Sequence, residues 1–308
     1  MIRSNDFSRS PQATEVATTI DVVRSNDFSR SLLSATEVAT TIGVMRSHPC
    51  FDEQAHERVG RVHLPVAPRC NIQCRFCERK VCANLTAQHP GWARQVLSPA
   101  EAVELVRRLA RAHPEEDFVV GVAGPGDPLA NAATFEALRQ VHQEHPALIK
   151  CVSTNGLLLE QALPQLLDAG VTALTVTVNA PDSQVGQHVY AWVRHGGTVY
   201  RGQAAAEILI ASQMRGLRAA IGAGLAVKVN TVLIPGVNDA HVVRLAHCLK
   251  EIGVRLMNIM SLIPSGQMVH LRAPTCDELR QARSDCEEAV PQFRRCEHCR
   301  ADVIHFPQ

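Results

Sequence analysis

Three cysteines stand close together in the stretch CNIQCRFC, where Cys70, Cys74 and Cys77 have a C-x3-C-x2-C spacing. Three thiolates on one loop occupy three corners of a tetrahedral or cubane site and leave one metal position for a substrate or cofactor. Zinc is the alternative, but zinc fingers pair two C-x2-C units, which this spacing does not reproduce. The motif therefore indicates a catalytic metal centre.

Composition narrows the class of protein. The chain has 308 residues, 46% of them hydrophobic, and its 31 basic residues almost balance 30 acidic ones. Such a balance gives no broad field to attract nucleic acid or an anionic membrane. We find no apolar run of membrane-spanning length and no secretory signal, and so expect a cytoplasmic protein. In that reducing compartment, 11 cysteines bunched near both ends of the core indicate metal or redox chemistry.

The elements that must position these cysteines alternate along the chain. Near-continuous apolar runs, typical of buried parallel strands, are followed by segments with apolar residues at helical spacing. The expected strands cover 62–68, 118–124, 149–155, 172–179, 226–234 and 256–263. The expected helices cover 98–109, 133–145, 160–169, 203–223 and 239–252.

Six strand–helix units predict an α/β fold with right-handed crossovers, and six are too few for a closed eight-stranded barrel. We therefore expect a partial (β/α)6 TIM-like barrel. Polar or glycine-rich motifs follow the strands, and strand carboxyl ends form the functional face of such folds. These motifs are CNIQC, GPGDP, STNG, VNAPD, IPGVND and IPSG.

The first 47 residues contain a duplication, because RSNDFSRS and ATEVATTI each occur twice. Two copies are too few for a solenoid, and the polar residues around them predict a poorly ordered extension. The expected division is thus an extension over 1–47, a core with cluster-binding segments at both ends over 48–303, and a tail over 304–308.

The cysteine triad on the first strand-loop of such a barrel resembles the radical S-adenosylmethionine (SAM) enzymes, whose three cysteines hold a [4Fe–4S] cluster while the fourth iron chelates SAM. Further motifs resemble the NifB family of nitrogenase cofactor maturases within that superfamily, over residues 48–303. The motifs are HPCFDEQAH, VAPRCNIQCRFCERK, CAN, AGPGDPLAN, CVSTNGL, IPGVND, NIM and CEHCRAD.

The resemblance implies a lyase- or transferase-type chemistry that uses SAM twice. Two further [4Fe–4S] clusters are substrates, and they are fused with an added sulfide and a SAM-derived carbide into an [8Fe–9S–C] precursor. One SAM methylates a cluster sulfide, and a second yields the 5′-deoxyadenosyl radical that removes hydrogen. Implied partners are a cluster donor protein, an electron donor such as a ferredoxin or flavodoxin, and a downstream carrier. We expect this carrier to be a separate protein, because the chain ends soon after CRADVIHFPQ.

The matching motifs also suggest how the substrate clusters are held. Five cysteines lie in them, and we expect these to be the accessory ligands, the alternative being buried inert thiols. His48 could complete a ligand set through a neutral imidazole, although a lone histidine is more often structural. The accessory set is Cys50, Cys82, Cys151, Cys296, Cys299 and His48. Cys248, Cys276 and Cys286 fall outside the motifs and are interpreted as structural.

Backbone groups of the glycine-rich turn and polar side chains at strand ends are the expected SAM contacts. Ile234 and Met260 would contribute an apolar edge for adenine. The set is Gly124, Pro125, Gly126, Asp127, Ser153, Thr154, Asn155, Asn179, Asn230, Ile234 and Met260. A tight turn capped by Asp127 is the alternative interpretation of the glycine-rich stretch.

One segment departs from the family pattern: CERKVCANLTAQHPGW lacks one residue before Cys82 and lacks the usual Glu-Ser-Arg-Pro-Gly-like run after it. One residue of shift moves an extended chain by about 3 Å, which makes the role of Cys82 less certain. Two other functions stay open: a radical SAM enzyme acting on an organic substrate, and a non-catalytic iron–sulfur scaffold.

Overall fold

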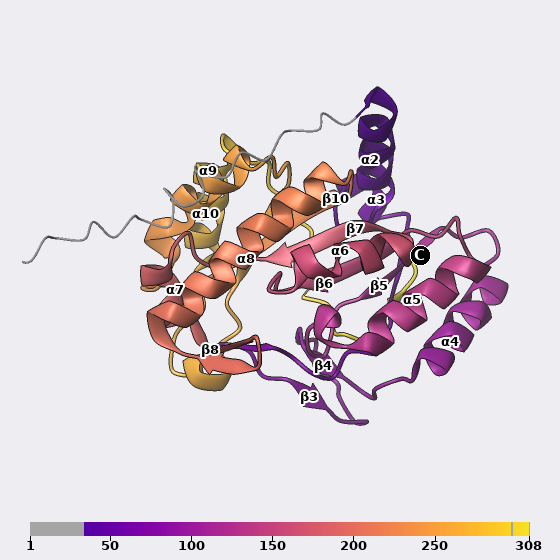
Figure 1. Cartoon of the computed structure of the whole chain (residues 1–308), viewed down its shortest axis with the longest axis horizontal. Coiled ribbons are helices and arrows are strands. Elements are labelled where there is room, and N and C mark those ends of the chain that lie inside the picture. The colour runs from indigo at the N-terminus through magenta and orange to yellow at the C-terminus, as the bar shows by residue number, and fades with distance from the viewer. Residues whose placement is uncertain (1–33, 297, 308) are drawn as a thin grey trace, which may run out of the picture.

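A computed structural model describes residues 34–296 and 298–307. Its centre is a curled seven-stranded sheet with the order β11-β10-β7-β6-β5-β1-β12 (Figure 1). The first six of these strands pair in parallel and β12 pairs antiparallel to β1. The strands are β1 Gly60–His63, β5 Phe118–Val122, β6 Lys150–Thr154, β7 Val171–Thr177, β10 Ala226–Leu233, β11 Met257–Ser261 and β12 Ile304–His305. The expected partial barrel of six parallel strands is confirmed.

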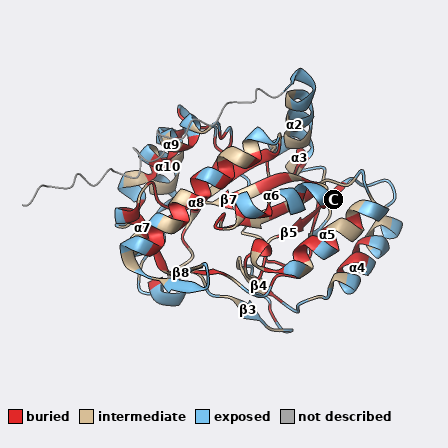
Figure 2. Cartoon of the chain, viewed as in Figure 1, coloured by how far each residue is buried: buried red, intermediate tan, exposed pale blue. Residues whose placement is uncertain are grey.

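Helices cover the outer face of the sheet, with buried faces toward it and exposed faces toward solvent (Figure 2). They are α4 Pro99–Ala112, α5 Ala132–Glu144, α6 Leu159–Asp168, α8 Gly202–Gly222 and α9 Val242–Glu251. Five helices were expected at these places, with ends within a few residues. The first predicted strand is displaced, because β1 ends at His63 and Ala67 instead forms an isolated bridge to Pro125.

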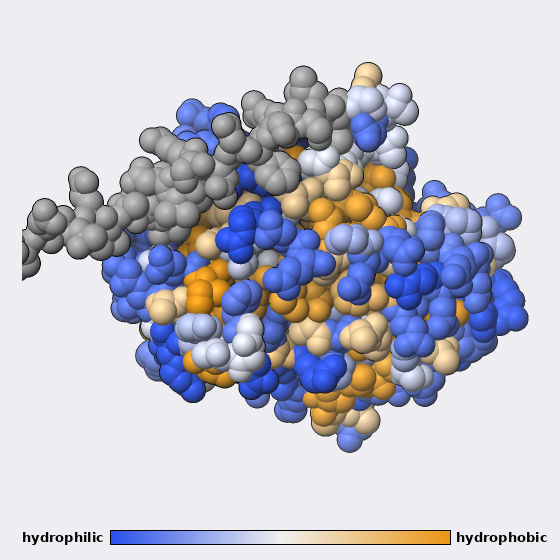
Figure 3. All heavy atoms as spheres, in the orientation of Figure 1, coloured by the Kyte–Doolittle hydropathy of each residue, from blue (hydrophilic) through white to orange (hydrophobic). Residues whose placement is uncertain are grey.

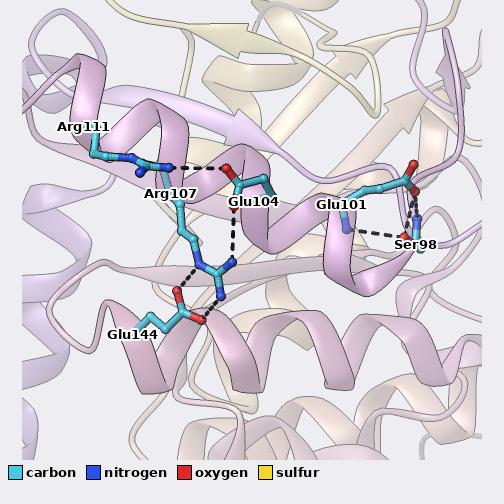
Figure 4. Close-up of polar contacts among 6 residues, drawn as sticks. All are labelled: Ser98, Glu101, Glu104, Arg107, Arg111 and Glu144. Atoms are coloured by element: carbon cyan, nitrogen blue, oxygen red, sulfur yellow. Dashed lines mark hydrogen bonds and ion pairs between the residues drawn. The ribbon is translucent and has the colours of Figure 1, made fainter.

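Helix α4 shows how local sequence sets one of these elements. Ser98 and Glu101 form a capping box, in which the Ser98 hydroxyl accepts from the Glu101 N–H and the Glu101 carboxylate accepts from the Ser98 N–H (Figure 4). Arg107 binds Glu104 on its own helix and Glu144 at the end of α5. These exposed pairs agree with the mostly hydrophilic surface over α4 and α5 (Figure 3).

Several elements were not predicted, and they surround the strand ends. The strands β2 Ile72–Cys74, β8 Tyr190–His195 and β9 Thr198–Tyr200 form a three-stranded sheet, and β3 Lys80–Val81 pairs with β4 Trp92–Ala93. The helices are α3 Glu53–His56, α7 Ser183–Val189 and α10 Cys276–Glu287, with 3-10 turns η1 Pro128–Ala130, η2 Asp239–His241 and η3 Gly266–Met268. Apart from α10, which has 12 residues, these elements are too short to show a clear periodicity in sequence.

The second copy of ATEVATTI lies in α2 Ala35–Ser47, which begins with a capping box formed by Ser34 and Glu37. The Thr41 hydroxyl donates to the carbonyl of Gly224 at 2.6 Å, which ties α2 to the barrel. Helical order over residues 35–47 differs from the poorly ordered extension we expected there. The first copy lies outside the described residues. Within the described part of the chain, no helix has the length and apolar character needed to span a membrane.

Candidate functional site

The triad loop is anchored by pairing with another strand and by one glutamine. Cys74, at the end of β2, pairs with Tyr190 of β8. The Gln73 amide donates to the carbonyl oxygens of Cys74 and Cys77, both at 2.8 Å, and its own oxygen accepts from Arg79 at 2.7 Å. Gln73 therefore determines the curvature of the loop that carries the thiols.

All three thiols line a cavity of about 220 Å³ at the C-terminal ends of the strands. Burial raises the pKa of Cys70 to about 11, with Asp127 adding to the increase, and raises the pKa of Cys74 well above its usual range. Burial also raises the pKa of Cys77, whereas Arg79 opposes this by charge and by a hydrogen bond. These thiols would thus become thiolates together only on binding a cationic centre.

The spacing of the ligands helps to identify that centre. Among the described residues, no three His, Cys, Asp or Glu side chains converge as the ligands of one metal ion would. A single zinc ion requires such convergence, whereas in a [4Fe–4S] cubane each cysteine binds a different iron. The set of three buried thiols on one loop therefore fits a cubane better than zinc.

Asp127 organises the opposite wall of this cavity. Its buried carboxylate accepts from the Thr154 hydroxyl at 2.9 Å and from the Asn155 N–H at 2.6 Å, and it caps η1 by accepting from the Leu129 N–H at 3.0 Å. Burial raises the pKa of Asp127, while these hydrogen bonds oppose the increase. The carboxylate thus joins the glycine-rich turn to the end of β6, as the alternative interpretation of a capped turn proposed.

Close backbone approach explains one of the glycines. A Cβ on Gly126 would lie 2.2 Å from the carbonyl oxygen of Arg69, and the Gly126 N–H donates to Ala67 at 2.6 Å. The glycine-rich turn therefore packs directly against the chain that leads into the triad loop. Asn155 completes this junction, since its side chain donates to Asn71 at 2.6 Å and to the Cys70 sulfur at 3.8 Å.

Most of the predicted SAM contacts line the triad cavity, but three do not. The lining includes Pro125, Gly126, Asp127, Ser153, Thr154, Asn155, Asn230 and Met260. Gly124 lies outside the lining. Asn179 is buried and its side chain accepts from the Val232 N–H at 2.8 Å, which joins β10 to the segment after β7. Ile234 is fully buried in the core, so in this structure it offers no edge for adenine.

A second cavity, of about 130 Å³, lies next to the first and shares residues with it. Ser153, Asn230, Met260 and His298 line both. Four of the five expected accessory cysteines line the second cavity: Cys50, Cys151, Cys296 and Cys299. We call it the accessory cavity.

The two cavities are stacked along the barrel. On β6 the triad cavity is lined by Ser153 to Asn155 and the accessory cavity by Cys151 to Ser153; on β7 the corresponding residues are Thr177 and Thr175. Residues two apart on a strand point to the same face of the sheet. The accessory cavity therefore lies nearer the N-terminal ends of these strands than the triad cavity does. The prediction that all functional groups lie at the C-terminal ends therefore describes only the triad cavity.

Gly121 makes room for the Cys151 thiol. A Cβ at Gly121 would lie 2.8 Å from the Cys151 sulfur and 3.2 Å from Cδ2 of His63. Burial raises the pKa of Cys151 to about 12, Cys50 raises it further and Lys228 lowers it. Both thiols line the accessory cavity.

The position of His48 bears on its expected role as an iron ligand. Its Nδ1 accepts from the Cys50 N–H at 3.1 Å, which places the proton of a neutral ring on Nε2. That Nε2 is buried and has no hydrogen-bond partner among the described residues. Burial, with the charges of Lys228 and His63, lowers the His48 pKa to about 3. In this geometry the ring offers an N–H donor, and coordination of iron would need the other tautomer.

The remaining cysteines lie apart from these cavities. Cys82 follows β3 and its N–H donates to Ala93, and it lines neither cavity. Cys286 is buried in the core, Cys248 is on α9, and Cys276 is exposed at the start of α10. None of these three lines either cavity, in keeping with a structural role.

Sequence reasoning missed several residues of the site. Gln73 and Arg79 carry no motif signal beyond their closeness to the triad. Phe76 and Ile263 line the triad cavity as apolar residues, and Lys228 lies in a run that reads as an ordinary strand. An inward-facing lysine in an otherwise apolar strand was the one signal that could have been noticed.

A comparison with protein families assigns the class. The model of the radical SAM superfamily matches residues 64–249, more than half of the chain. The chain therefore belongs to this superfamily of SAM-using enzymes, whose members carry a [4Fe–4S] cluster. Streptococcus suis SuiB bound to SAM has a similar fold, with a TM-score of 0.54 and 11% identity over 84% of this chain and 55% of that one.

Curated relatives narrow the assignment. The FeMo cofactor biosynthesis protein NifB of Methanocaldococcus jannaschii is 47% identical over 257 residues, covering 83% of this chain and 85% of the relative. The protein of that name from Klebsiella pneumoniae is 44% identical over 266 residues, covering 84% of this chain and 56% of the relative. The chain belongs to the NifB family.

Proposed function

We propose that this protein acts in FeMo cofactor biosynthesis by fusing two [4Fe–4S] substrate clusters, with an added sulfide and a SAM-derived carbide, into an [8Fe–9S–C] precursor. Family membership supports the cofactor pathway. The observation that supports cluster fusion with a SAM-derived carbide is the stacking of the two cavities, which share Ser153, Asn230 and Met260. A group delivered from the triad cavity would enter the accessory cavity directly.

The triad cavity is the proposed site of the resident cluster and SAM. Cys70, Cys74 and Cys77 would hold the cluster, which together with SAM supplies one-electron cleavage of the sulfonium. Gln73 and Arg79 hold the loop in shape, and Arg79 also places a positive charge beside the thiols. Phe76 and Ile263 give the cavity apolar walls that exclude water.

The accessory cavity is the proposed site of the substrate clusters. Cys50 and Cys151 approach from the N-terminal segment and from β6, whereas Cys296 and Cys299 come from the segment after α10. Four thiols that line one cavity would hold two clusters close enough to fuse. Cys82 remains a proposed ligand from outside this cavity. A cluster donor, an electron donor and a carrier for the product remain proposed partners.

Three cysteine variants test the assignment after anaerobic reconstitution with iron and sulfide. Cys74→Ala should lose 5′-deoxyadenosine formation from SAM, because it removes an anchor of the resident cluster. Cys299→Ala should keep much of that activity but form no eight-iron product. Cys276→Ala, which alters an exposed thiol, is the matched control and should keep both.

The outcomes separate the alternatives. Iron near four per chain in the unaltered protein, with SAM cleavage intact, would instead indicate a radical SAM enzyme for an organic substrate. Clusters without SAM cleavage would indicate a scaffold. Retained 5′-deoxyadenosine formation in Cys74→Ala would refute the triad assignment.

A further inference from the structure

Lys228 is a buried cation on the wall of the accessory cavity. It lies on β10 opposite Thr175 of β7, and only 3% of the residue is exposed. Its ammonium donates to the carbonyl of Cys50 at 2.6 Å and lies 5.2 and 4.9 Å from the ring centroids of Phe51 and Phe293. A carbonyl and two aromatic faces solvate the charge but do not neutralise it.

Two arginines, Arg61 and Arg295, line the same cavity, and none of its described lining residues is Asp or Glu. Burial lowers the pKa values of the lining histidines His48, His63 and His298, so these rings add no charge. Arg295 pairs with Glu57 at the exposed edge, and Arg61 is 1% exposed and contacts His56. A buried ammonium such as that of Lys228 is costly unless an anion compensates it, because burying one ion costs several kcal/mol.

We propose that Lys228 is a positioning residue that draws an anionic iron–sulfur substrate cluster into the accessory cavity and holds it against Cys50 and Cys151. The inference rests on the proposed function, which makes that cluster a substrate. Thiolates and bridging sulfides give a cysteine-bound cubane its negative charge, and a nearby ammonium lowers the free energy of that anion. Lys228 also fixes the Cys50 backbone, so the same side chain orients a ligand and balances its charge.

A purely structural role is the competing explanation, since Lys228 ties the segment around Cys50 to the barrel. The two roles predict different melting temperatures for the apo protein of the Lys228→Met variant. If the lysine is there for packing, Lys228→Met lowers the melting temperature of the apo protein. If it is there for the cluster, the substitution removes a costly buried charge together with the contact to Cys50, and the apo melting temperature falls no further than in Lys150→Met, which loses a like contact.

The experiment compares the unaltered protein, Lys228→Met, Lys228→Arg and Lys150→Met. Lys150 is a matched control, being a strand lysine that is 1% exposed, donates to the Pro146 carbonyl at 2.9 Å and lies outside both cavities. After anaerobic reconstitution, we expect Lys228→Met to hold about four fewer irons per chain, equal to one cluster. Lys228→Arg should recover them, and Lys150→Met should lose none.

An EPR-monitored redox titration gives a readout that packing alone would not move. Accessory cluster retained in Lys228→Met should have a more negative reduction potential than in the unaltered protein, and Lys228→Arg should restore it. Full iron with an unchanged potential in Lys228→Met, or a lower apo melting temperature that accounts for the iron loss, overturns the proposal while leaving cluster fusion intact. Absence of accessory clusters from the unaltered protein overturns both.

Discussion

Gly121→Ala tests whether the floor of the accessory cavity needs the space left by a missing side chain. An alanine Cβ would lie 2.8 Å from the Cys151 sulfur and 3.2 Å from His63 Cδ2. Normal contacts begin near 3.4 Å, so the sulfur must move by more than half an ångström. The simplest movement is rotation of the thiol away from the cavity.

The cost should be visible in two measurements. Overpacking a well-filled interior by one methyl costs about 1–3 kcal/mol. For a chain of this size that corresponds to a loss of roughly 2–6 °C in the melting temperature of the apo protein. The displaced Cys151 should also lower iron incorporation by about one four-iron cluster. Formation of 5′-deoxyadenosine should persist, because the triad cavity lies further along the strands.

Gly43→Ala is the control for this prediction. Gly43 lies inside α2, and nothing stands within 4 Å of its added Cβ. Alanine should therefore stabilise that helix by about 0.5–1 kcal/mol and leave iron content unchanged. If Gly121→Ala binds iron fully and melts with the unaltered protein, the thiol does not occupy the position described here.

Three other predictions follow from single contacts. Thr154→Val removes a hydrogen-bond donor from the buried Asp127 carboxylate and should lower the free energy of unfolding in urea by about 1–3 kcal/mol. Thr172→Val is the control and should have no measurable cost, because the Thr172 hydroxyl has no partner among the described residues. Gln73→Leu should weaken SAM binding and resident-cluster retention without changing accessory iron, and equal loss from both sites would contradict this. Burial lowers the Lys150 pKa to about 8, so between about pH 8 and 10.4 the unfolded chain binds more protons than the folded protein and the free energy of unfolding rises with pH. The measurement is the difference in this free energy between the unaltered protein and Lys150→Met. A difference that does not change with pH over that range would disprove the shift.

The sequence was sufficient for the barrel because its strands and helices have strong periodic patterns. Five of the six parallel strands, and helices such as α4 and α8, were predicted within a few residues of their ends, and only the first strand was displaced. The short pieces β2, β8 and β9 were missed, since two- to six-residue strands outside the main sheet have too few residues for a period to be seen. Tertiary pairing defines them, between Cys74 and Tyr190 for β2 and β8 and between Val193 and Tyr200 for β8 and β9.

The site was predicted well where a motif coincides with a strand end and less well elsewhere. Pro125 to Asp127 and Ser153 to Asn155 lie together along the triad cavity. Asn179 and Ile234 also follow strands, but their side chains face the neighbouring segment and the core. The face of the sheet toward which a side chain points depends on the register of the strand and on where the strand ends. Sequence alone predicts both only to within a residue or two.

The depth of the accessory cavity explains why its proposed ligands come from three distant parts of the chain. A strand can present an inward side chain only at every second residue, so one strand supplies at most one thiol at a given level of the barrel. Gly121 pairs with Cys151, and one inward step further along, Thr175 pairs with Ser153 and with Lys228. These neighbours provide space, a hydroxyl and a charge instead of further thiols. The other ligands must then enter from outside the sheet, and Cys50 and Cys296 do so on segments that precede β1 and follow α10.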